Sequence, residues 1–458
     1  MVYLIVTKIK EQIMESIKLN FSKTNGKIKH MNSVNNGPVA KSVREFDNFD
    51  DYKAAKIPYA RIHDASFYPS YGGEFTVDVH RIFRNFDNDV NDPKSYSFKS
   101  TDKYLQSIVD AGTKVFYRLG CNIEHYEKCG TIPPKDNQKW AEICEHIVRH
   151  YTEGWADGFY YDIEYWEIWN EADCKNADGT SPCWQGTEDE FIDFFVTAFK
   201  HLKTTFPKLK IGGPAFAYLP ECYPFAERLF DKLNKENLKL DFFSYHTYAT
   251  DTDWFLYMVN FAYDLAKRCG QGQAELILNE WNYVKGWRGK EWQYTLKTEK
   301  GLKGASFITA IMCAGQKAPL DMLMYYDARP CGMNGMFNTD TFEKLKGYYP
   351  IAYFSKLLEL GKYVEDISSS KDLCVCSATN GIDSAILLTH YNDNDETEQK
   401  TVKLDLSGLG EKSSVEIFVL DEKNDMSSYS SFGVNGSSVD FTLDIPLFTT
   451  YFISIKRA

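Results

Sequence analysis

Short apolar segments alternate with amphipathic segments along most of this chain. Between residues 30 and 360, runs with the period-two pattern of strands are followed by runs with the 3.6-residue period of helices. We expect strands at 30–37, 57–64, 114–119, 165–171, 209–215, 240–248, 275–282 and 322–328, and helices at 42–55, 101–111, 136–152, 187–206, 223–235, 253–268, 303–317 and 349–360. Eight such units predict a parallel sheet closed into a (β/α)₈ TIM barrel, an α/β fold over residues 30–360.

The pattern changes after about residue 361. Strands expected at 373–378, 384–391, 401–406, 414–420, 439–444 and 449–456 are separated by polar turns, by the acidic run 393–396 and by a Ser/Gly-rich stretch at 427–438. This spacing predicts an accessory all-β sandwich domain over residues 361–458. Residues 15–29, with a turn at Asn25-Gly26, are expected to add a strand to it.

Charge and hydropathy restrict the partners. The formal net charge of −12 argues against nucleic acid or an anionic membrane as a partner. The chain has no apolar run of about 18 residues, so no membrane span is expected. Met1–Val6 is too short a hydrophobic region for a signal peptide, which predicts a cytoplasmic protein, with export as the alternative and Met14 as an alternative start.

The 11 cysteines are scattered and form no CxxC motif. We expect reduced, mostly buried thiols, as is usual inside cells. Cys174 and Cys183 bracket the loop after Glu171, and a disulfide between them is the alternative for an exported protein, which we expect less than free thiols.

Two of the expected strands end in a carboxylate beside an amide. Residues 165–171 close on Asn170-Glu171, and residues 275–282 contain Asn279-Glu280. A single strand-end glutamate is usually a solvated rim residue, but the carboxyl ends of parallel barrel strands meet at one face. Glycoside hydrolysis needs two carboxyl groups flanking a sugar, one protonated and one ionised. The pair therefore predicts a glycosidase.

Four strand-end motifs together resemble glycoside hydrolase family 39, a family of retaining (β/α)₈ glycosidases that includes β-xylosidases and α-L-iduronidases. Trp169-Asn170-Glu171 resembles the acid/base motif, and Leu278-Asn279-Glu280-Trp281 resembles the nucleophile motif. Residues 59–64 and 242–248 are similar to the second and sixth strands of that family. One departure is that strand eight ends in Tyr326 and Asp327, where many related enzymes carry a tryptophan.

The resemblance implies a retaining mechanism with Glu171 as acid/base and Glu280 as nucleophile, their carboxyl groups about 5–5.5 Å apart. Arg61 and Tyr248 are expected to donate to Glu280. Asn170 is expected to bind the sugar's 2-hydroxyl.

Further residues at strand ends are candidates for substrate binding. His63, Asn122, Glu124 and His246 are expected either to bind hydroxyls or to orient a carboxylate. Trp281 is expected either to wall the site, with Trp287 and Trp292, or to pack in its loop. No cofactor is expected. Metal binding at His63-Asp64 or Glu124-His125 is not expected, because neighbouring residues on a strand point to opposite faces.

The substrate is expected to be a neutral, β-linked, xylose-like sugar. A uronide would need a basic partner for its carboxylate, and Lys285, Arg288 and Arg329 are the candidates. The alternatives are an α-L-iduronidase-like uronide hydrolase and a non-catalytic carbohydrate-binding barrel, the latter disfavoured because both glutamates are present. The pattern leaves the linkage, exo or endo action and the oligomeric state open.

Overall fold

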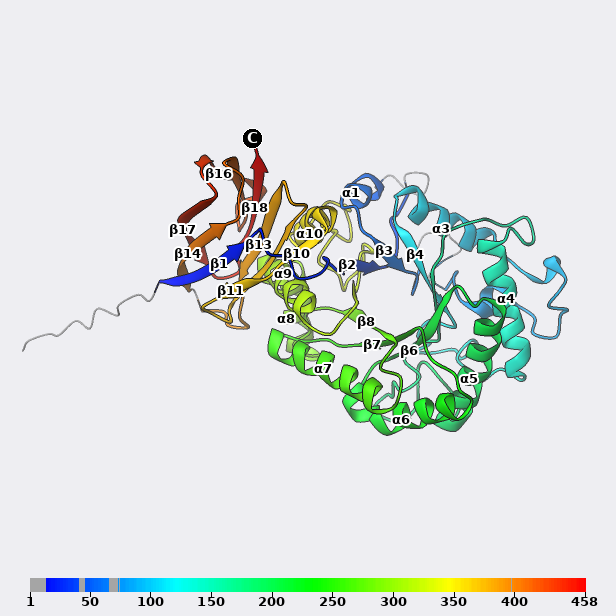
Figure 1. Cartoon of the computed structure of the whole chain (residues 1–458). Helices are drawn as coiled ribbons and strands as arrows, with labels where there is room; N and C mark the ends of the chain where they lie inside the picture. The colour runs from blue at the N-terminus through cyan, green and yellow to red at the C-terminus, as the bar shows by residue number, and fades with distance from the viewer. Residues whose placement is uncertain (1–13, 41–45, 66–72, 74, 397) are drawn as a thin grey trace, which may run out of the picture. The chain divides into compact units, whose positions relative to one another are not determined.

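The computed structural model describes residues 14–40, 46–65, 73, 75–396 and 398–458. Contacts divide the chain into two compact units (Figure 1). One unit contains residues 28–359, and the other combines residues up to 27 with residues 360–458.

The larger unit is a closed barrel of eight parallel strands, which confirms the predicted fold. The strands follow each other around the barrel in chain order. They are β2 (His30–Asn35), β3 (Tyr59–Arg61), β4 (Lys114–Leu119), β5 (Tyr165–Ile168), β6 (Lys210–Phe216), β7 (Phe242–His246), β8 (Glu275–Trp281) and β9 (Met322–Tyr325). Because every strand is parallel to its neighbours, all eight carboxyl ends lie at the same face.

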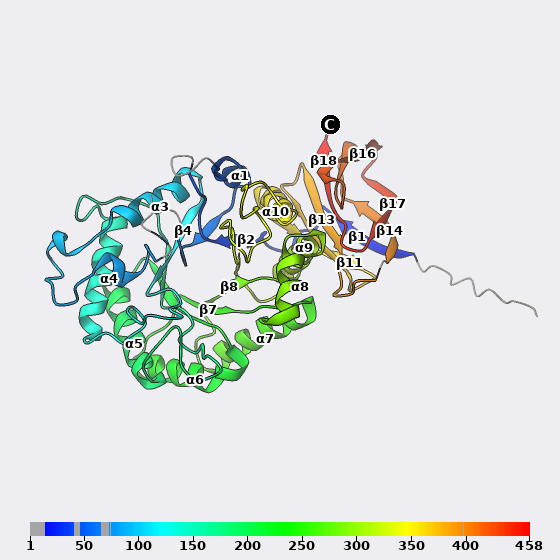
Figure 2. The same ribbon diagram turned by 180° about the vertical axis from the view of Figure 1, so that it is seen from behind.

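Helices surround the strands, as the views from the two sides show (Figures 1 and 2). They are α1 (Phe49–Ala54), α2 (Val79–Ile82), α3 (Lys99–Asp110), α4 (Asn137–Thr152), α5 (Glu188–Thr205), α6 (Leu219–Lys235), α7 (Thr252–Arg268), α8 (Gly289–Glu299), α9 (Leu302–Lys317) and α10 (Tyr348–Leu360), with a 3₁₀ turn, η2, at Pro93–Ser95. Polar side chains begin several of them: Asp136 caps α4, Asp251 caps α7, and Thr187 with Glu190 forms a capping box on α5.

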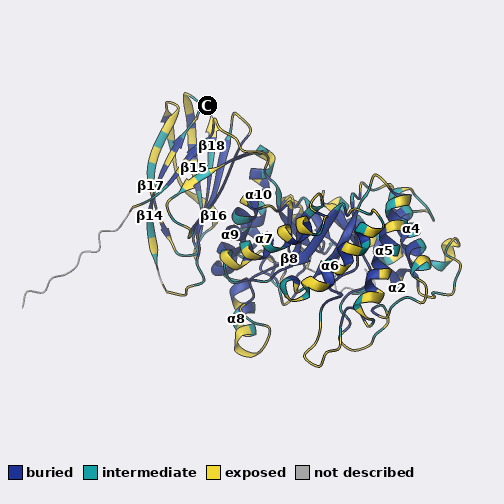
Figure 3. Cartoon of the chain, turned by 60° about the horizontal axis from the view of Figure 1, so that its bottom comes forward, coloured by how far each residue is buried: buried dark blue, intermediate teal, exposed yellow. Residues whose placement is uncertain are grey.

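Aromatic and apolar side chains fill the barrel below the carboxyl face. Tyr59, Phe116, Tyr165, Phe242, Ile277, Met322 and Met324 form one buried cluster, contributed by six of the strands. Figure 3 shows buried strands inside helices whose outward faces are exposed. This packed layer leaves the strand ends above it as the place where polar side chains can gather.

The smaller unit consists of two β-sheets. One sheet has the order β11-β1-β14-β17 and the other the order β10-β12-β13-β18-β15-β16. The strands are β1 (Glu15–Asn20), β10 (Lys362–Val364), β11 (Asp366–Ser368), β12 (Leu373–Thr379), β13 (Ser384–His390), β14 (Gln399–Ser407), β15 (Lys412–Leu420), β16 (Asp425–Asn435), β17 (Ser438–Pro446) and β18 (Thr450–Arg457). Side chains from both sheets form one apolar core. β1 pairs in parallel with β14, so the amino-terminal segment belongs to this unit.

Several elements differ from the expectation. The Ser/Gly-rich stretch 427–438, expected to interrupt the strands, is largely strand β16, whose mostly exposed side chains give it no apolar pattern. Helix α8 is not among the expected helices, and α6, expected from residue 223, begins at Leu219 and includes Pro224. The turn at Asn25-Gly26 is followed by an isolated bridge at Lys27 rather than by a second strand. Of the helix expected at 42–55, residues 42–45 lie outside the described residues, as does the start of the chain before Met14.

Candidate active site

Five polar side chains from four strands meet at the carboxyl face of the barrel. Arg61 ends β3, Asn170 and Glu171 follow β5, His246 ends β7, and Glu280 lies near the end of β8. Each of these five residues is buried. The strand β5 ends in an irregular backbone in which Trp169 has a φ of 75° and Glu171 a φ of 50°. Such left-handed conformations are uncommon outside glycine, and here they direct Glu171 toward the group.

Glu280 receives a donor on each carboxylate oxygen. Arg61 Nη1 donates to Oε1 at 2.7 Å, and the Tyr248 hydroxyl donates to Oε2 at 3.0 Å. Both contacts expected for Glu280 are therefore present. Burial raises the pKa of Glu280, while His246 and Arg61 oppose that effect. The two donors stabilise the ionised form, which is the form that can attack a carbon atom.

Glu171 is held differently. Its Oε1 lies 2.7 Å from Nδ1 of His246, which is itself 3.5 Å from Oε2 of Glu280. Burial raises the pKa of Glu171 to about 7 and lowers the pKa of His246 to about 4. Near neutral pH a large fraction of Glu171 therefore carries a proton beside an uncharged imidazole. This is the protonation state that a general acid requires.

The two carboxyl groups approach each other closely. An oxygen of Glu171, an oxygen of Glu280 and a ring nitrogen of His246 all lie within 4.8 Å of one another. An inverting glycosidase needs about 6.5–9.5 Å between its carboxyl groups to admit a water molecule, whereas a retaining one needs only about 5–5.5 Å. The close approach favours the retaining geometry. The same three groups are also near enough to hold a cation, although Glu280 already forms an ion pair with Arg61.

A buried carboxylate that the sequence reasoning did not select orients Arg61. Glu167, on β5, accepts from Arg61 Nε at 2.6 Å and from the Ser244 hydroxyl and the Asn279 amide at 2.6 and 2.5 Å. Arg61 and Glu167 are both fully buried. The sequence did contain a signal for Glu167. It lies within an apolar strand, whose side chains point alternately into the barrel and toward the helices, so either direction buries its carboxylate. A charged residue inside such a strand needs a buried partner.

Asn170 also contacts Arg61. Its Oδ1 accepts from Arg61 Nη2 at 2.6 Å, and its Nδ2 has no hydrogen-bond partner among the described residues. The side chain is completely buried. A buried amide donor without a partner is costly, so this group is suited to binding a substrate hydroxyl.

His63 and Asn122 lie beside the same group, around Asp64. His63 Nδ1 lies 3.9 Å from Glu280 Oε1, and burial lowers its pKa well below 6.5, so the ring is neutral. The Asn122 side chain donates to Asp64 Oδ1, and the Tyr326 hydroxyl donates to Asp64 Oδ2. The side-chain amide of Asn122 is therefore already hydrogen-bonded within the protein, unlike Nδ2 of Asn170, which has no partner among the described residues.

The structure does not bring Glu124 into this group. Its carboxylate accepts backbone N–H groups of Cys129, Gly130 and Thr131, and it also accepts the Thr131 hydroxyl. Burial raises the pKa of Glu124, but these hydrogen bonds outweigh that effect and lower it overall. The Glu124 carboxylate thus stabilises the loop that follows it, because it accepts hydrogen bonds from three backbone N–H groups of residues 129–131.

Trp281 does not wall the site either. It is buried and packs against Phe307 of α9 and Tyr325 of β9, with ring centroids 6.2 and 5.4 Å away. Alternation along β8 is the physical reason, because Glu280 points into the barrel and its neighbour must point outward to the helices. Trp287 is half exposed and lies edge-on to Tyr248 at 4.9 Å, so it packs beside a residue that donates to Glu280.

The three basic residues considered for a uronide have other surroundings. Arg329 is buried against two carboxylates, with Nη2 at 3.1 Å from Asp64 and 3.4 Å from Asp327. Lys285 is exposed and lies over the ring of Tyr294 at 5.4 Å. Arg288 is exposed at the start of α8.

All 11 cysteines are free thiols. The sulfur atoms of Cys174 and Cys183 nevertheless lie within 4.8 Å of each other and of a Glu171 oxygen. No helix in the described part of the chain has both the length and the apolar character needed to span a membrane.

Comparisons with known proteins show which family the chain resembles. The model for glycosyl hydrolases family 39 matches residues 33–270. A β-xylosidase from Geobacillus stearothermophilus is 24% identical over 184 residues, an alignment that covers 37% of this chain and 34% of that enzyme. The alignment thus spans about a third of that relative's length.

Two solved structures are similar over nearly the whole chain. A glucosidase from Croceicoccus marinus superposes with a TM-score of 0.81 at 18% identity, covering 98% of this chain and 99% of the other. A bacterial orthologue of human α-L-iduronidase superposes with a TM-score of 0.70 at 14% identity, covering 97% and 84%. At these identities the likeness establishes the shared fold.

Proposed function

We propose that this chain, which belongs to glycosyl hydrolase family 39, is a retaining glycosidase that hydrolyses a neutral β-linked glycoside by double displacement. Glu280 attacks the anomeric carbon while Glu171 gives its proton to the departing glycosidic oxygen. Glu171, now ionised, then takes a proton from water, which displaces Glu280 from the sugar. Both steps invert the anomeric carbon, so the product keeps the substrate's configuration.

The observation that carries the proposal is that Glu171 and Glu280, which lie close together in space, have different hydrogen-bond partners and different protonation states. Glu280 has a donor on each oxygen, whereas Glu171 faces a neutral histidine and has a pKa of about 7. A retaining mechanism needs this division, because one group must begin ionised and the other protonated. Asn170 supports it further, since its Nδ2 donor is available for the 2-hydroxyl, a contact that strengthens in the transition state.

The surroundings of Arg329 support a neutral sugar. A buried uronate carboxylate would need a cation, and Arg329 is already neutralised by Asp64 and Asp327. Lys285 and Arg288 are exposed, where a single ion pair contributes at most about 1 kcal/mol. A xylose-like or glucose-like residue therefore suits the site better than a uronide.

The test is a panel of aryl glycosides with the purified chain. We expect the highest kcat/KM for a β-D-xyloside or β-D-glucoside, with NMR showing that the β-anomer of the free sugar forms first. Faster turnover of an α-L-iduronide, slowed by salt and lost in Arg329→Ala, would contradict the neutral-sugar assignment. The α-anomer as first product from a β-glycoside would contradict retention, and binding without hydrolysis would favour a carbohydrate-binding barrel.

A further inference from the structure

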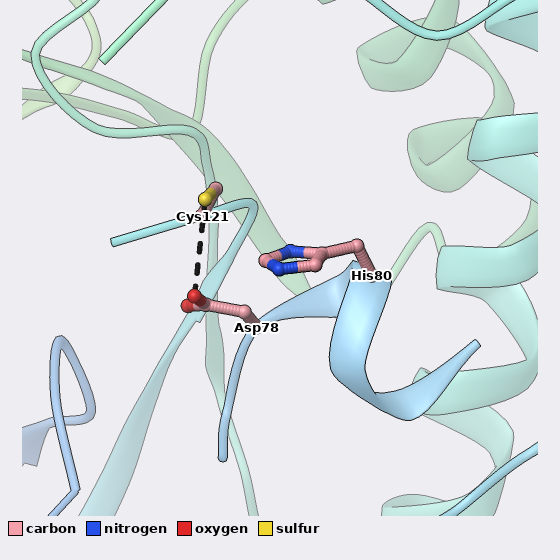
Figure 4. A group of neighbouring side chains, drawn as sticks. All are labelled: Asp78, His80 and Cys121. Carbon is pink, nitrogen blue, oxygen red and sulfur yellow. Dashed lines mark hydrogen bonds between the residues drawn. The ribbon is translucent and has the colours of Figure 1, made fainter. Parts of the chain in front are cut away.

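A second group of chemically active side chains lies outside the catalytic centre. Asp78, His80 and Cys121 each place one potential ligand atom within 4.8 Å of the other two. Figure 4 shows the imidazole of His80 extending toward the Cys121 sulfur and the Asp78 carboxylate. His80 is on α2 in the connection between β3 and α3, and Cys121 follows β4. The group therefore joins two separate loops at the carboxyl face of the barrel.

Each of the three residues has a donor atom directed into the group. Asp78 accepts from Arg118 and from the Asn122 N–H on Oδ1, and its Oδ2 accepts from the Cys121 thiol at 3.8 Å. Both ring nitrogens of His80 are buried without a hydrogen-bond partner in the described part of the chain. The side chain is partly exposed, and Nε2 lies 3.9 Å from Glu124 Oε1, too far for a hydrogen bond. Buried polar atoms without a hydrogen bond are costly, which points to a ligand rather than to a purely structural role.

The backbone packs closely against these three side chains, and a cavity borders them. A Cβ atom added to Gly130 would lie 2.1 Å from His80 Nδ1 and 2.6 Å from the Cys121 sulfur, so the glycine lets the backbone close over the group. A cavity of about 320 Å³ lined by His80, Cys129 and Gly130 borders it. An ion could enter from this side.

We propose that Asp78, His80 and Cys121 form a binding site for a divalent zinc-like cation. A carboxylate, an imidazole and a thiolate are the ligands that Zn²⁺ prefers, and three protein ligands leave a fourth position for water. Ligands around tetrahedral zinc lie roughly 3.4–3.8 Å apart at the usual bond lengths. The 3.8 Å between Asp78 Oδ2 and the Cys121 sulfur already meets this spacing.

Charge and proton balance are consistent with such an ion. Binding of the ion converts the Cys121 thiol into a thiolate and releases one proton to solvent. The ion would face Asp78, the new thiolate and Glu124, whose Oε1 lies 3.9 Å from His80 Nε2, with Arg118 as the neighbouring cation. The two positive charges of the ion and the one of Arg118 therefore balance the negative charges of Asp78, the Cys121 thiolate and Glu124.

A bound ion would link two loops beside the proposed active site. Cys121 is adjacent to Asn122, whose side chain donates to Asp64, and Asp78 accepts the Asn122 backbone N–H. A bound ion would cross-link residues 78–80 to residues 121–122 and stabilise the folded chain by mass action. The site would act on structure rather than on the reacting atoms.

Cobalt provides a direct test, because a cysteine thiolate bound to Co²⁺ gives a near-ultraviolet charge-transfer band. The chelator-treated chain, kept reduced with a phosphine, is titrated with Co²⁺ alone and, separately, with Zn²⁺ alone. We expect one equivalent to bind, a charge-transfer band with Co²⁺, release of a proton and a higher melting temperature. Cys121→Ser should abolish the band, and His80→Gln should weaken binding by at least about tenfold.

A matched control separates this site from the other possible metal sites. Cys174→Ser/Cys183→Ser removes the thiols near Glu171, and the group of Glu171, His246 and Glu280 contains no sulfur. The band should persist in the control. A band that survives Cys121→Ser, a band lost in the control, or no binding by the unmodified chain would overturn the proposal. If Cys121→Ser does not fold by circular dichroism, unchanged affinity in His80→Gln would overturn it.

Discussion

Glu167 and Arg61 form a fully buried ion pair, with Arg61 Nε donating to Glu167 Oε2 at 2.6 Å. The other guanidinium nitrogens of Arg61 reach Glu280 and Asn170. Glu167 therefore holds the guanidinium in place, and the guanidinium in turn holds two residues of the proposed catalytic centre. This is a positioning role, because Glu167 has no contact with the place where a sugar would react.

Replacing Glu167 by glutamine should lower both stability and activity. The glutamine amide would meet the donors Ser244 and Asn279, which now point at a carboxylate oxygen. Leaving such groups unpaired costs about 1–3 kcal/mol, measurable as a lower urea midpoint. The kcat should fall more than KM rises, since the loss acts on Glu280. Glu275→Gln, at the amino end of β8, is the control, and an equal effect there would contradict the positioning role.

Removing each of the two proposed catalytic carboxylates should have a distinct effect. Glu280→Ala should reduce turnover to the detection limit, because no covalent intermediate can form. Glu171→Ala should reduce kcat/KM by about 10²–10⁴-fold for substrates with poor leaving groups, the usual loss for a general acid. Azide should restore turnover of an activated aryl glycoside by Glu171→Ala and yield the β-glycosyl azide.

Glu164→Ala, at the amino end of β5, is the control for that experiment and should keep its activity. Azide rescue of neither variant, or formation of the β-glycosyl azide by the Glu280 variant instead, would contradict the assignment of the two roles.

The pH dependence of kcat/KM should be bell-shaped. Glu171 must be protonated, so activity should fall as pH rises through its pKa of about 7. Glu280 must be ionised, so activity should fall at low pH, with a midpoint above 4.5 because burial raises its pKa. Measuring kcat/KM from about pH 4 to 9 with a substrate that has a poor leaving group reports both groups in the free enzyme.

Tyr248→Phe tests the acid side of this profile. The variant removes the 3.0 Å hydrogen bond to Glu280 Oε2, which stabilises the ionised form. The acid limb should therefore move to higher pH while the alkaline limb stays in place. Movement of the alkaline limb alone would show that Tyr248 acts on Glu171.

Glu299 should make the protein less stable as pH rises. Its carboxylate is buried without a hydrogen-bond partner in the described part of the chain, and burial raises its pKa to about 9. Above about pH 4.5 the unfolded chain loses this proton while the folded chain keeps it, so stability declines up to about pH 9. Glu299→Gln removes that loss.

The stability difference between Glu299→Gln and the unmodified chain should therefore grow with pH, by at most about 1.4 kcal/mol per pH unit. Urea unfolding at a series of pH values measures it. Glu343→Gln, at an exposed position, should show no such trend, and a constant difference for Glu299→Gln would refute the raised pKa.

The sequence by itself determined the barrel and its two principal carboxylates. Strand and helix periods are local properties, and eight alternating units permit few folds besides a closed parallel barrel. Glu171 and Glu280 were found because parallel strands bring their carboxyl ends together, so position along a strand is enough to place a residue at the site. The same local reasoning failed for β16, whose exposed polar side chains carry no period.

Only the tertiary structure decided what each side chain contacts. Trp281 and Glu280 are neighbours in the sequence, yet one packs under a helix and the other reaches Arg61 and Tyr248. Glu124 lies next to strand β4 but binds its own loop, and Glu167 pairs with Arg61, 106 residues away. Asp78, His80 and Cys121 share no motif and meet only because two loops close over Gly130. Contacts of this kind depend on packing between distant segments, which no local period encodes.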